Sequence, residues 1–217
     1  MNQTPARRFL LWIDGVGGYL ACLSDSVTLG QPGGPVAPSD RLGNVAGSAA
    51  TVDVPILGDL SHRHATISRS GEGYTIQPLR AVQINDRPIE QTTMLHDGDN
   101  IRLGNSVVYR FRVPHPLSQT ARLDPISYHR TQPTTKGILL MAESCILGPA
   151  SNSQVICPRW TGEVVLFRQP PGSAAPLGCR TSQPYSIDGK VAASRAAVQF
   201  NSQISGSDFA FGLESLP

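Results

Sequence analysis

The sequence contains little of what several large classes of protein require. Lys136 and Lys190 are its only lysines, and 18 Lys and Arg side chains face 16 carboxylates, a formal net charge of +2. Proteins that hold nucleic acid by neutralising phosphates need a larger excess of positive charge, so we expect no nucleic-acid partner. No apolar run approaches the roughly 20 residues that span a bilayer, so we also expect no membrane insertion.

Cysteine is scarce as well, and no C-x-x-C pair links its four positions, Cys22, Cys145, Cys157 and Cys179. Zinc and redox sites usually show that spacing, so we expect no metal and no cofactor. The apolar run after Arg8 ends at Asp14, too early for a secretory signal. We therefore expect a cytoplasmic protein whose thiols are reduced and buried.

Turn-forming residues are plentiful, with 21 glycines and 18 prolines beside a hydrophobic content of 40%. This composition favours many short strands over helices, and no window shows helical periodicity over three turns. Short strands are predicted at residues 9–13, 19–23, 26–29, 51–54, 64–68, 74–77, 82–84, 100–103 and 107–113. Residues 31–50, rich in Gly, Pro, Ala and Ser, are predicted to form a long loop. The pattern is typical of an all-β sandwich or barrel.

Two collinear series of segments resemble each other. Residues 18–23 and 26–30 read GYLACL and SVTLG, and residues 137–141 and 144–148 read GILLM and SCILG. The order continues with three further pairs: 52–55 with 155–158, 82–86 with 185–189, and 109–111 with 209–211. We therefore predict two diverged copies, at residues 1–113 and 134–217, joined by a linker at 114–133 that has no strand pattern.

The densest polar cluster, Ser61-His62-Arg63-His64-Ala65, resembles the Ser-x-x-His-Ala signature of forkhead-associated (FHA) domains. That family has a Leu-Gly strand end before the signature and a Gly-Asp-x-Ile-x-Leu-Gly run after it. Residues 29–30 supply the first and residues 98–104 the second, so the resemblance covers about residues 19–113. It implies an all-β fold, with two β-sandwich domains of FHA type in tandem, the second degenerate.

In FHA domains the signature serine and an arginine after the first Leu-Gly bind phosphothreonine, while the histidine braces the loop. Ser61 and His64 match these positions, but Gln31 stands where the arginine belongs and cannot form a charged fork to phosphate. Arg63 or Arg80 would replace that charge only if their loops converge on Ser61. The family's Asn-Gly-Thr loop is also altered, and only its later Asn-Gly turn is approximated by Asn85.

Other readings of the same residues stay open. One is that Ser61 only satisfies backbone groups in a turn. Another is that His62 and His64 ligate a metal, although no third ligand follows at a suggestive spacing. No nucleophile elbow or paired carboxylates are present, so we expect no enzyme and no catalytic residues. The second copy lacks Ser-x-x-His. Arg159 and Trp160 are its interface candidates, although a tryptophan is more often a core residue.

The resemblance therefore implies a protein-interaction module that binds a protein or a phosphothreonine peptide through Ser61, Arg63, Arg80 and Asn85, with His64 bracing the loop. The alternative is a structural scaffold or assembly protein whose partner is bound independently of phosphorylation.

Overall fold

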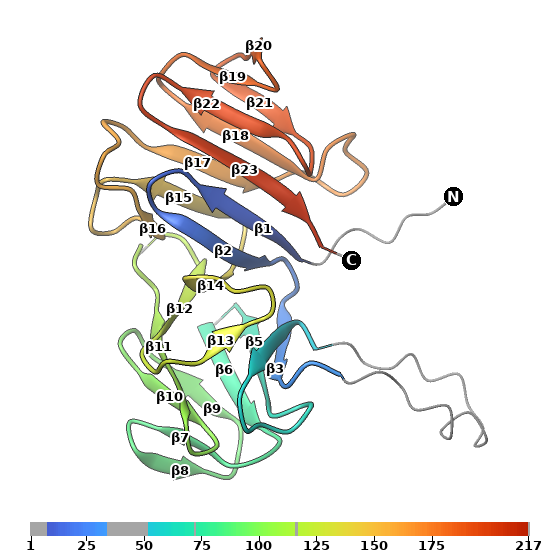
Figure 1. Ribbon diagram of the computed structural model, residues 1–217, viewed down its shortest axis with the longest axis vertical. Helices are drawn as coiled ribbons and strands as arrows, with labels where there is room; N and C mark the ends of the chain where they lie inside the picture. The colour runs from blue at the N-terminus through green and yellow to red at the C-terminus, as the bar shows by residue number, and fades with distance from the viewer. Residues whose placement is uncertain (1–7, 34–51, 72, 116, 217) are drawn as a thin grey trace, which may run out of the picture.

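A computed structural model describes residues 8–33, 52–71, 73–115 and 117–216 (Figure 1). The described residues contain strands and turns but no helix, which confirms the all-β prediction. None of this part of the chain forms a helical segment with the length and hydropathy of a membrane span. Most of the loop predicted at residues 31–50 lies outside the described residues.

The strands form three sheets. The largest has twelve strands, in the spatial order β20 (Lys190–Val191), β19 (Tyr185–Ile187), β22 (Gln203–Gly206), β23 (Ala210–Ser215), β1 (Arg8–Ile13), β2 (Gly17–Cys22), β14 (Gly137–Leu140), β12 (Ala121–Pro125), β11 (Val107–Arg112), β10 (Asn100–Leu103), β7 (Val82–Ile84) and β8 (Arg87–Ile89). This long sheet runs through the whole molecule.

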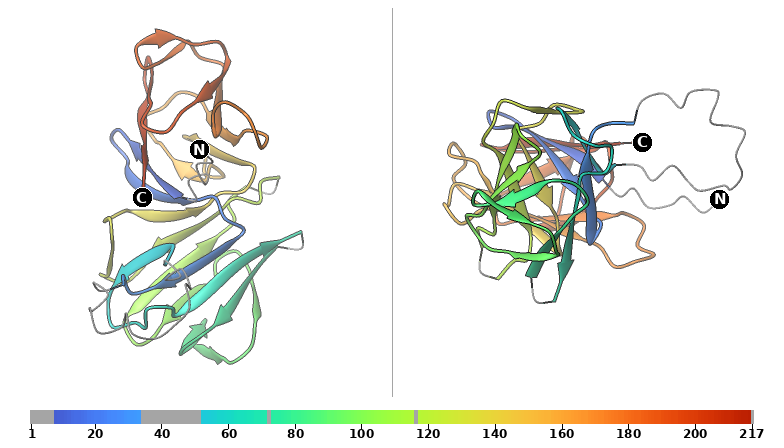
Figure 2. Two further views of the ribbon diagram at one scale, coloured as in Figure 1. Left: turned by 90° about the vertical axis from the view of Figure 1, so that its right-hand side faces the viewer. Right: turned by 90° about the horizontal axis from the view of Figure 1, so that it is seen from below.

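Two smaller sheets complete the architecture. One has six strands, in the order β13 (Arg130–Thr131), β4 (Val54–Leu57), β3 (Ser26–Gly30), β5 (Ala65–Ser70), β6 (Gly73–Pro78) and β9 (Thr93–Leu95). The other has five strands, in the order β16 (Val155–Ile156), β15 (Ser144–Gly148), β17 (Val164–Arg168), β18 (Leu177–Thr181) and β21 (Arg195–Val198). Each packs against one half of the long sheet, so the molecule is two sandwiches that share a sheet (Figures 1 and 2).

The shared strands β2 and β14 are buried on both faces, and so is the middle of β1. Along β1, Leu10 contributes to the core of the first sandwich and Leu11 to the core of the second. Along β14, Ile138 faces the first core and Leu139 the second. Successive side chains of a strand point to opposite faces, which explains why these segments read as continuous apolar runs without polar alternation.

The strand pairing does not follow the order of the chain. The hairpin β1–β2 pairs with the C-terminal strand β23, where Leu11 lies opposite Leu213, and so completes the second sandwich. Conversely, β12 pairs with β11, where Leu123 lies opposite Phe111, and with β14, which completes the first sandwich. The two sandwiches therefore exchange strands within one chain, as the blue hairpin beside the red strand shows in Figure 1.

This exchange corrects two predictions about the chain. The segment at residues 114–133 is not a linker without strands, because it contains β12 and β13, and Ala121 and Leu123 are fully buried. The ranges 1–113 and 134–217 do not delimit the two sandwiches, because each sandwich includes strands from outside its own range. The reason is that sequence alternation identifies a strand but not its neighbour.

The two halves have the same strand order. From either edge to the middle, the long sheet reads β8, β7, β10, β11, β12, β14 in one half and β20, β19, β22, β23, β1, β2 in the other. The smaller sheets likewise read β4, β3, β5, β6, β9 and β16, β15, β17, β18, β21. At the middle, β2 and β14 occupy equivalent places and pair in parallel.

Hydrogen bonds define which residues correspond. Asn85 and Asp188 each have a φ of 51°, and their amides donate to Asn100 and Gln203 respectively, at 2.9 Å in both cases. Counting along the paired strands from Asn100 and Gln203, Tyr109 corresponds to Phe211. The predicted match of 109–111 with 209–211 is thus off by two residues. A shift of two leaves every side chain on the same face, so alternation alone could not reveal it.

Candidate functional site

His64 holds together the loop that carries the Ser-x-x-His signature. Only 4% of its surface is exposed. The backbone amide of Ser61 donates to Nδ1 of the ring at 3.3 Å, and Nε2 lies 2.9 Å from the carbonyl oxygen of Ala81. Because Nδ1 accepts from an amide, the proton must be on Nε2, which then donates to Ala81. The ring therefore joins the β4–β5 loop to the loop between β6 and β7.

The backbone of His64 makes the same connection. Its amide donates to the carbonyl of Leu29 at the end of β3, at 2.9 Å. Its carbonyl oxygen accepts from the amides of Leu79 and Arg80, both at 3.0 Å. The backbone and ring of this one residue thus connect the end of β3, the β4–β5 loop and the β6–β7 loop.

Gln31 is attached to the same loop on its other side. Its amide donates to the carbonyl of Ser61 at 3.0 Å, and its own carbonyl lies 3.0 Å from Nδ1 of His62. Gly30 allows this approach, because a Cβ there would lie 2.0 Å from the carbonyl oxygen of His62. The side chain of residue 31 consequently starts directly beside Ser61.

The β10–β11 turn closes the cluster. The amide of Gly104 donates to the carbonyl of Ala81 at 3.0 Å, and Gly104 has a φ of 56°. A Cβ at this position would lie 3.3 Å from the carbonyl oxygen of Asp59. Four connections, after β3, β4, β6 and β10, therefore meet at one end of the first sandwich, and we refer to residues 31, 61–64, 79–81 and 104 as the loop cluster.

The predicted site residues divide into two groups. Ser61 is half-buried, and in the described part of the chain its hydroxyl makes no hydrogen bond. Arg63 and Arg80 are exposed on the same loops, and the Arg80 guanidinium donates to the adjacent carbonyl of Leu79 at 2.7 Å. The loops that carry both arginines do converge on that of Ser61, although no bond joins either guanidinium to the serine among the described residues.

Asn85 lies outside the loop cluster. It occupies the turn between β7 and β8, so it is separated from Ala81 by the full length of β7, about 13 Å for an extended chain. Its side-chain amide donates to Asp99 at 2.8 Å, and its side-chain oxygen accepts from the amide of Asn100 at 3.0 Å. With a positive φ and both side-chain polar atoms bonded, Asn85 is a turn residue.

Sequence reasoning missed the structural contributions of Ala81 and Gly104. Ala81 takes part through its carbonyl oxygen, which accepts from His64 and from Gly104, and any residue type provides that atom. No signal in the sequence could have identified it. Gly104 was visible as the last residue of the Gly-Asp-x-Ile-x-Leu-Gly run, but not its place against Asp59.

The metal and thiol alternatives can be compared with the geometry. Both ring nitrogens of His64 bond within the protein, so His62 and His64 do not present two free ring nitrogens to one ion. All four cysteines are buried, and burial raises their pKa values to about 12. They are therefore protonated core residues at neutral pH, as expected, and not reactive thiolates.

The corresponding loop of the second half is built differently. Counting from Ala65 and Val164, which occupy equivalent places on β5 and β17, Trp160 and Glu163 stand where the first half has Ser61 and His64. Thr161 replaces the histidine brace: its amide donates to the Asp208 carboxylate, and Gln183 donates to its hydroxyl at 2.8 Å. Hydrogen bonding from the side chain and the backbone amide of Thr161 lowers the pKa of Asp208.

Trp160 does not form an exposed interface. It is 5% exposed and packs against Phe209, with ring centroids 5.3 Å apart, inside the second core. Arg159 beside it is exposed. Of the two alternatives for Trp160, the core position is confirmed and the interface position is wrong, because the equivalent of the signature serine has become part of the hydrophobic core.

Comparison with known proteins identifies one part of the chain. A search of curated proteins finds no match. A family model described as the FHA domain matches residues 44–104, which is less than a third of the 217 residues. The match contains β4 to β10 and with them Ser61, His64, Ala81 and Gly104. All of the loop cluster except Gln31 thus lies in the segment that is similar to FHA domains.

Proposed function

We propose that this protein is a non-catalytic interaction module that binds a partner protein at the loop cluster, with a phosphothreonine peptide as the ligand. The observation that supports this most directly is the pair of hydrogen bonds that the His64 ring makes, one with the amide of Ser61 and one with the carbonyl of Ala81, within the segment that matches the FHA model. It leaves the Ser61 hydroxyl on a braced loop tip, ready to donate to a phosphate oxygen.

The positive charge that would bind this phosphate comes from other positions than the arginine that FHA domains use. Gln31 begins beside Ser61 but is neutral, so Arg63 and Arg80 are the cations that the proposal assigns to phosphate binding. Both are exposed, and the loop of Arg80 is bonded to His64. An exposed guanidinium can rotate onto a ligand at the cost of side-chain entropy, so we expect weaker binding than a fixed arginine would give.

We further propose that the second half is a degenerate FHA-like copy. The support is the common strand order of the two halves and the matching bonds of Asn85 and Asp188. Its Trp160, Thr161 and Glu163 provide no serine and histidine at the loop tip, so this copy would serve assembly and not phosphate recognition.

An alternative function is that of a scaffold whose partner is bound regardless of phosphorylation. Gln31 favours it, because the residue that would supply the fixed charge is neutral. The two functions differ in their response to phosphatase, since only the first requires the phosphate.

The test uses the immobilised full chain and a degenerate phosphothreonine peptide library, with and without phosphatase treatment. The phosphopeptide proposal expects retention that is lost after phosphatase and reduced by the Ser61→Ala substitution. Ser194→Ala, at an exposed serine of the second half, is the matched control and should retain the library. Retention that survives both phosphatase and Ser61→Ala would reject the proposal in favour of the scaffold.

A further inference from the structure

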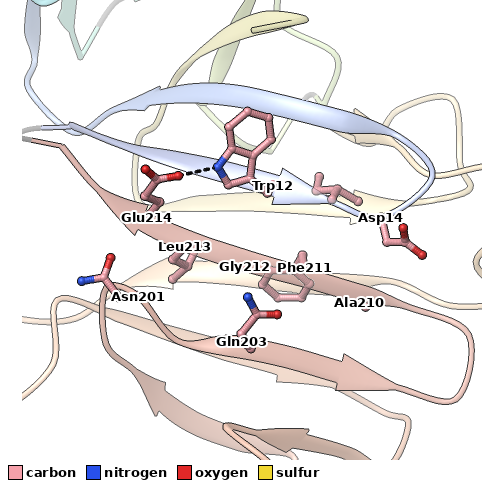
Figure 3. Close-up of a pocket in the computed structure, with 10 residues that line it drawn as sticks. Trp12, Asp14, Asn201, Gln203, Ala210, Phe211, Gly212, Leu213 and Glu214 are labelled. Atoms are coloured by element: carbon pink, nitrogen blue, oxygen red, sulfur yellow. Dashed lines mark hydrogen bonds between the residues drawn. The ribbon is translucent and has the colours of Figure 1, made fainter. Parts of the chain in front are cut away.

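A second surface, distant in the fold from the loop cluster, lies on the outer face of β22, β23 and β1. Trp12 is 42% exposed there, although its neighbours Leu11 and Ile13 are buried in the second core. The strand register places Gln203, Gly212 and Trp12 in one row across the three strands. Figure 3 shows Trp12 and Gln203 on either side of the glycine.

The surface is hollow at Gly212. The indole ring of Trp12 leans the other way, over Gly18, where a Cβ would come within 2.3 Å of the ring. On the Gly212 side a pocket lies between the indole and Gln203, whose amide nitrogen is 3.3 Å from the position that a Cβ of Gly212 would take. The resulting cavity of about 460 Å³ is also lined by Asp14, Asn201 and Glu214.

The hollow is acidic and its aromatic wall is fixed. Glu214 follows Gly212 by two residues, on the same face, and one of its carboxylate oxygens accepts the indole N–H of Trp12 at 2.7 Å. Among the residues that the structure describes, its other oxygen accepts no hydrogen bond. Within the described residues, no lysine or arginine forms an ion pair with Asp14 or Glu214.

The first half shows what occupies the same place there. By register, the row equivalent to Gln203, Gly212 and Trp12 consists of Asn100, Arg110 and Asp124. In that row the guanidinium of Arg110 lies over the sheet, and its Nε donates to the side-chain oxygen of Asn100 at 3.2 Å. The second half keeps the amide, as Gln203, but has glycine in place of the arginine.

We propose that the hollow over Gly212 binds an arginine side chain of a partner protein. The guanidinium stacks on the indole of Trp12 and donates to the carboxylate oxygen of Glu214 that the indole does not use. Planar stacking and a fork of donors favour arginine over lysine, whose ammonium is a compact and strongly hydrated charge. This surface acts independently of phosphate recognition at Ser61.

The indole N–H signals of the full chain measure this binding, because the two tryptophans, Trp12 and Trp160, provide a probe and an internal control. The ligands are acetyl-Gly-Arg-Gly-amide and the same peptide with lysine or with neutral citrulline. We expect a saturable shift of the Trp12 signal with the arginine peptide, affinity lower by about tenfold for lysine, and no shift for citrulline. The signal of buried Trp160 should not move.

Two variants locate the site. Gly212→Ala places a methyl group in the hollow, and Glu214→Gln removes the charge but keeps an acceptor for the indole. Each should weaken arginine binding by about tenfold, whereas Ser61→Ala should leave it unchanged. Equal affinity for arginine and lysine, a shift that does not saturate, or unaltered binding in both variants would overturn the proposal. Because Ser61 lies elsewhere, these outcomes do not bear on the phosphopeptide test.

Discussion

At the scale of single residues, the loop cluster depends on one side chain far more than on its neighbours. His64 is buried and bonded through both ring nitrogens, whereas the hydroxyl of Ser61 is not used by the described protein. Structural and functional roles are thus separated between two residues of the same short motif. A pair of alanine substitutions can distinguish them.

The first prediction concerns this pair. His64→Ala should lower the free energy of unfolding by about 1–3 kcal/mol, because it leaves the Ser61 amide without a partner and removes one of the two donors to the Ala81 carbonyl. Ser61→Ala should change it by no more than about 0.5 kcal/mol while reducing phosphopeptide binding. Urea unfolding monitored by circular dichroism measures both values. Similar losses for the two variants would contradict the assignment of the brace to His64.

The second prediction concerns Gln31. Its backbone is hydrogen-bonded to Ser61, so Gln31→Arg places a guanidinium next to the hydroxyl that is proposed to contact phosphate. A charged hydrogen bond contributes about 1.5–3 kcal/mol, which corresponds to a gain of roughly ten- to hundredfold in affinity for a phosphothreonine peptide. Calorimetry with paired phosphorylated and unmodified peptides measures the gain, which should shrink at high salt.

Gln31→Lys is the control, because lysine adds a positive charge without the planar guanidinium that can form two parallel hydrogen bonds. It should give a smaller gain in affinity. If neither variant binds the phosphorylated peptide better than the native chain, while both remain folded, the altered segment at Arg80 and Ala81 is the greater defect. The site would then serve a different ligand.

At the scale of elements, residues 126–131 attach the end of β12 to the edge of the smaller sheet through β13. The Ser127 hydroxyl accepts from the amide of Val108 at 2.8 Å, so its own proton points to Nδ1 of His129, 2.7 Å away. The imidazole packs edge-on against Tyr109, with ring centroids 4.5 Å apart. Burial lowers the pKa of His129 from 6.5, so the neutral ring is favoured in the folded state.

The third prediction follows from that shift. Because the unfolded chain takes up a proton at His129 more readily than the folded chain, stability is greatest above pH 6.5 and declines as the pH falls toward the lowered pKa. In His129→Gln this part of the decline should be absent. Urea unfolding of both proteins between pH 8 and pH 5 measures the difference, and parallel curves would contradict the prediction.

The sequence predicted the positions of elements better than their partners. Residues 82–84 and 100–103 were expected as strands and are β7 and β10, because alternation of apolar residues is local. The exchange of β1–β2 against β12 and β14 was not expected, since pairing depends on three-dimensional packing. Likewise Ser61 and His64 were found from their motif, while the carbonyl of Ala81 and the remoteness of Asn85 required the structure.

At the scale of the whole molecule, the middle of the long sheet belongs to both cores at once. Leu10, Leu20 and Ile138 face the first core, and Leu11 and Leu139 face the second. Removing these strands from either sandwich would expose apolar surface on both faces of the sheet. We therefore expect the fold to depend on the exchange, and not on the order in which the halves occur in the chain.

The fourth prediction compares two fragments of similar length. A fragment of residues 24–140 contains β3 to β14. It loses Leu10, Leu20 and Cys22 from the first core but keeps the strands of that sandwich next to one another, so it should fold as a sandwich and unfold cooperatively. A fragment of residues 1–113 lacks β12 and β14, and with them the core residues Ala121, Leu123, Ile138 and Leu140, so it should show no cooperative transition. Thermal unfolding and amide dispersion in NMR spectra test both. Cooperative folding of 1–113 as a monomer would contradict the shared-strand architecture.

The pairing of β1 with β23 also determines how this fold could be circularly permuted. Phe9 lies opposite Ser215, so the start of the first described strand and the end of the last are neighbours in the sheet. Suppose that a short connection joined these two ends and that the chain were opened between β2 and β3. The two sandwiches would then no longer exchange strands. The permuted order would run through β3 to β14 and then through β15 to β23, β1 and β2, with each sandwich contiguous. The exchange of strands between the two halves therefore depends on how the strands are connected along the chain, and not on how their side chains pack.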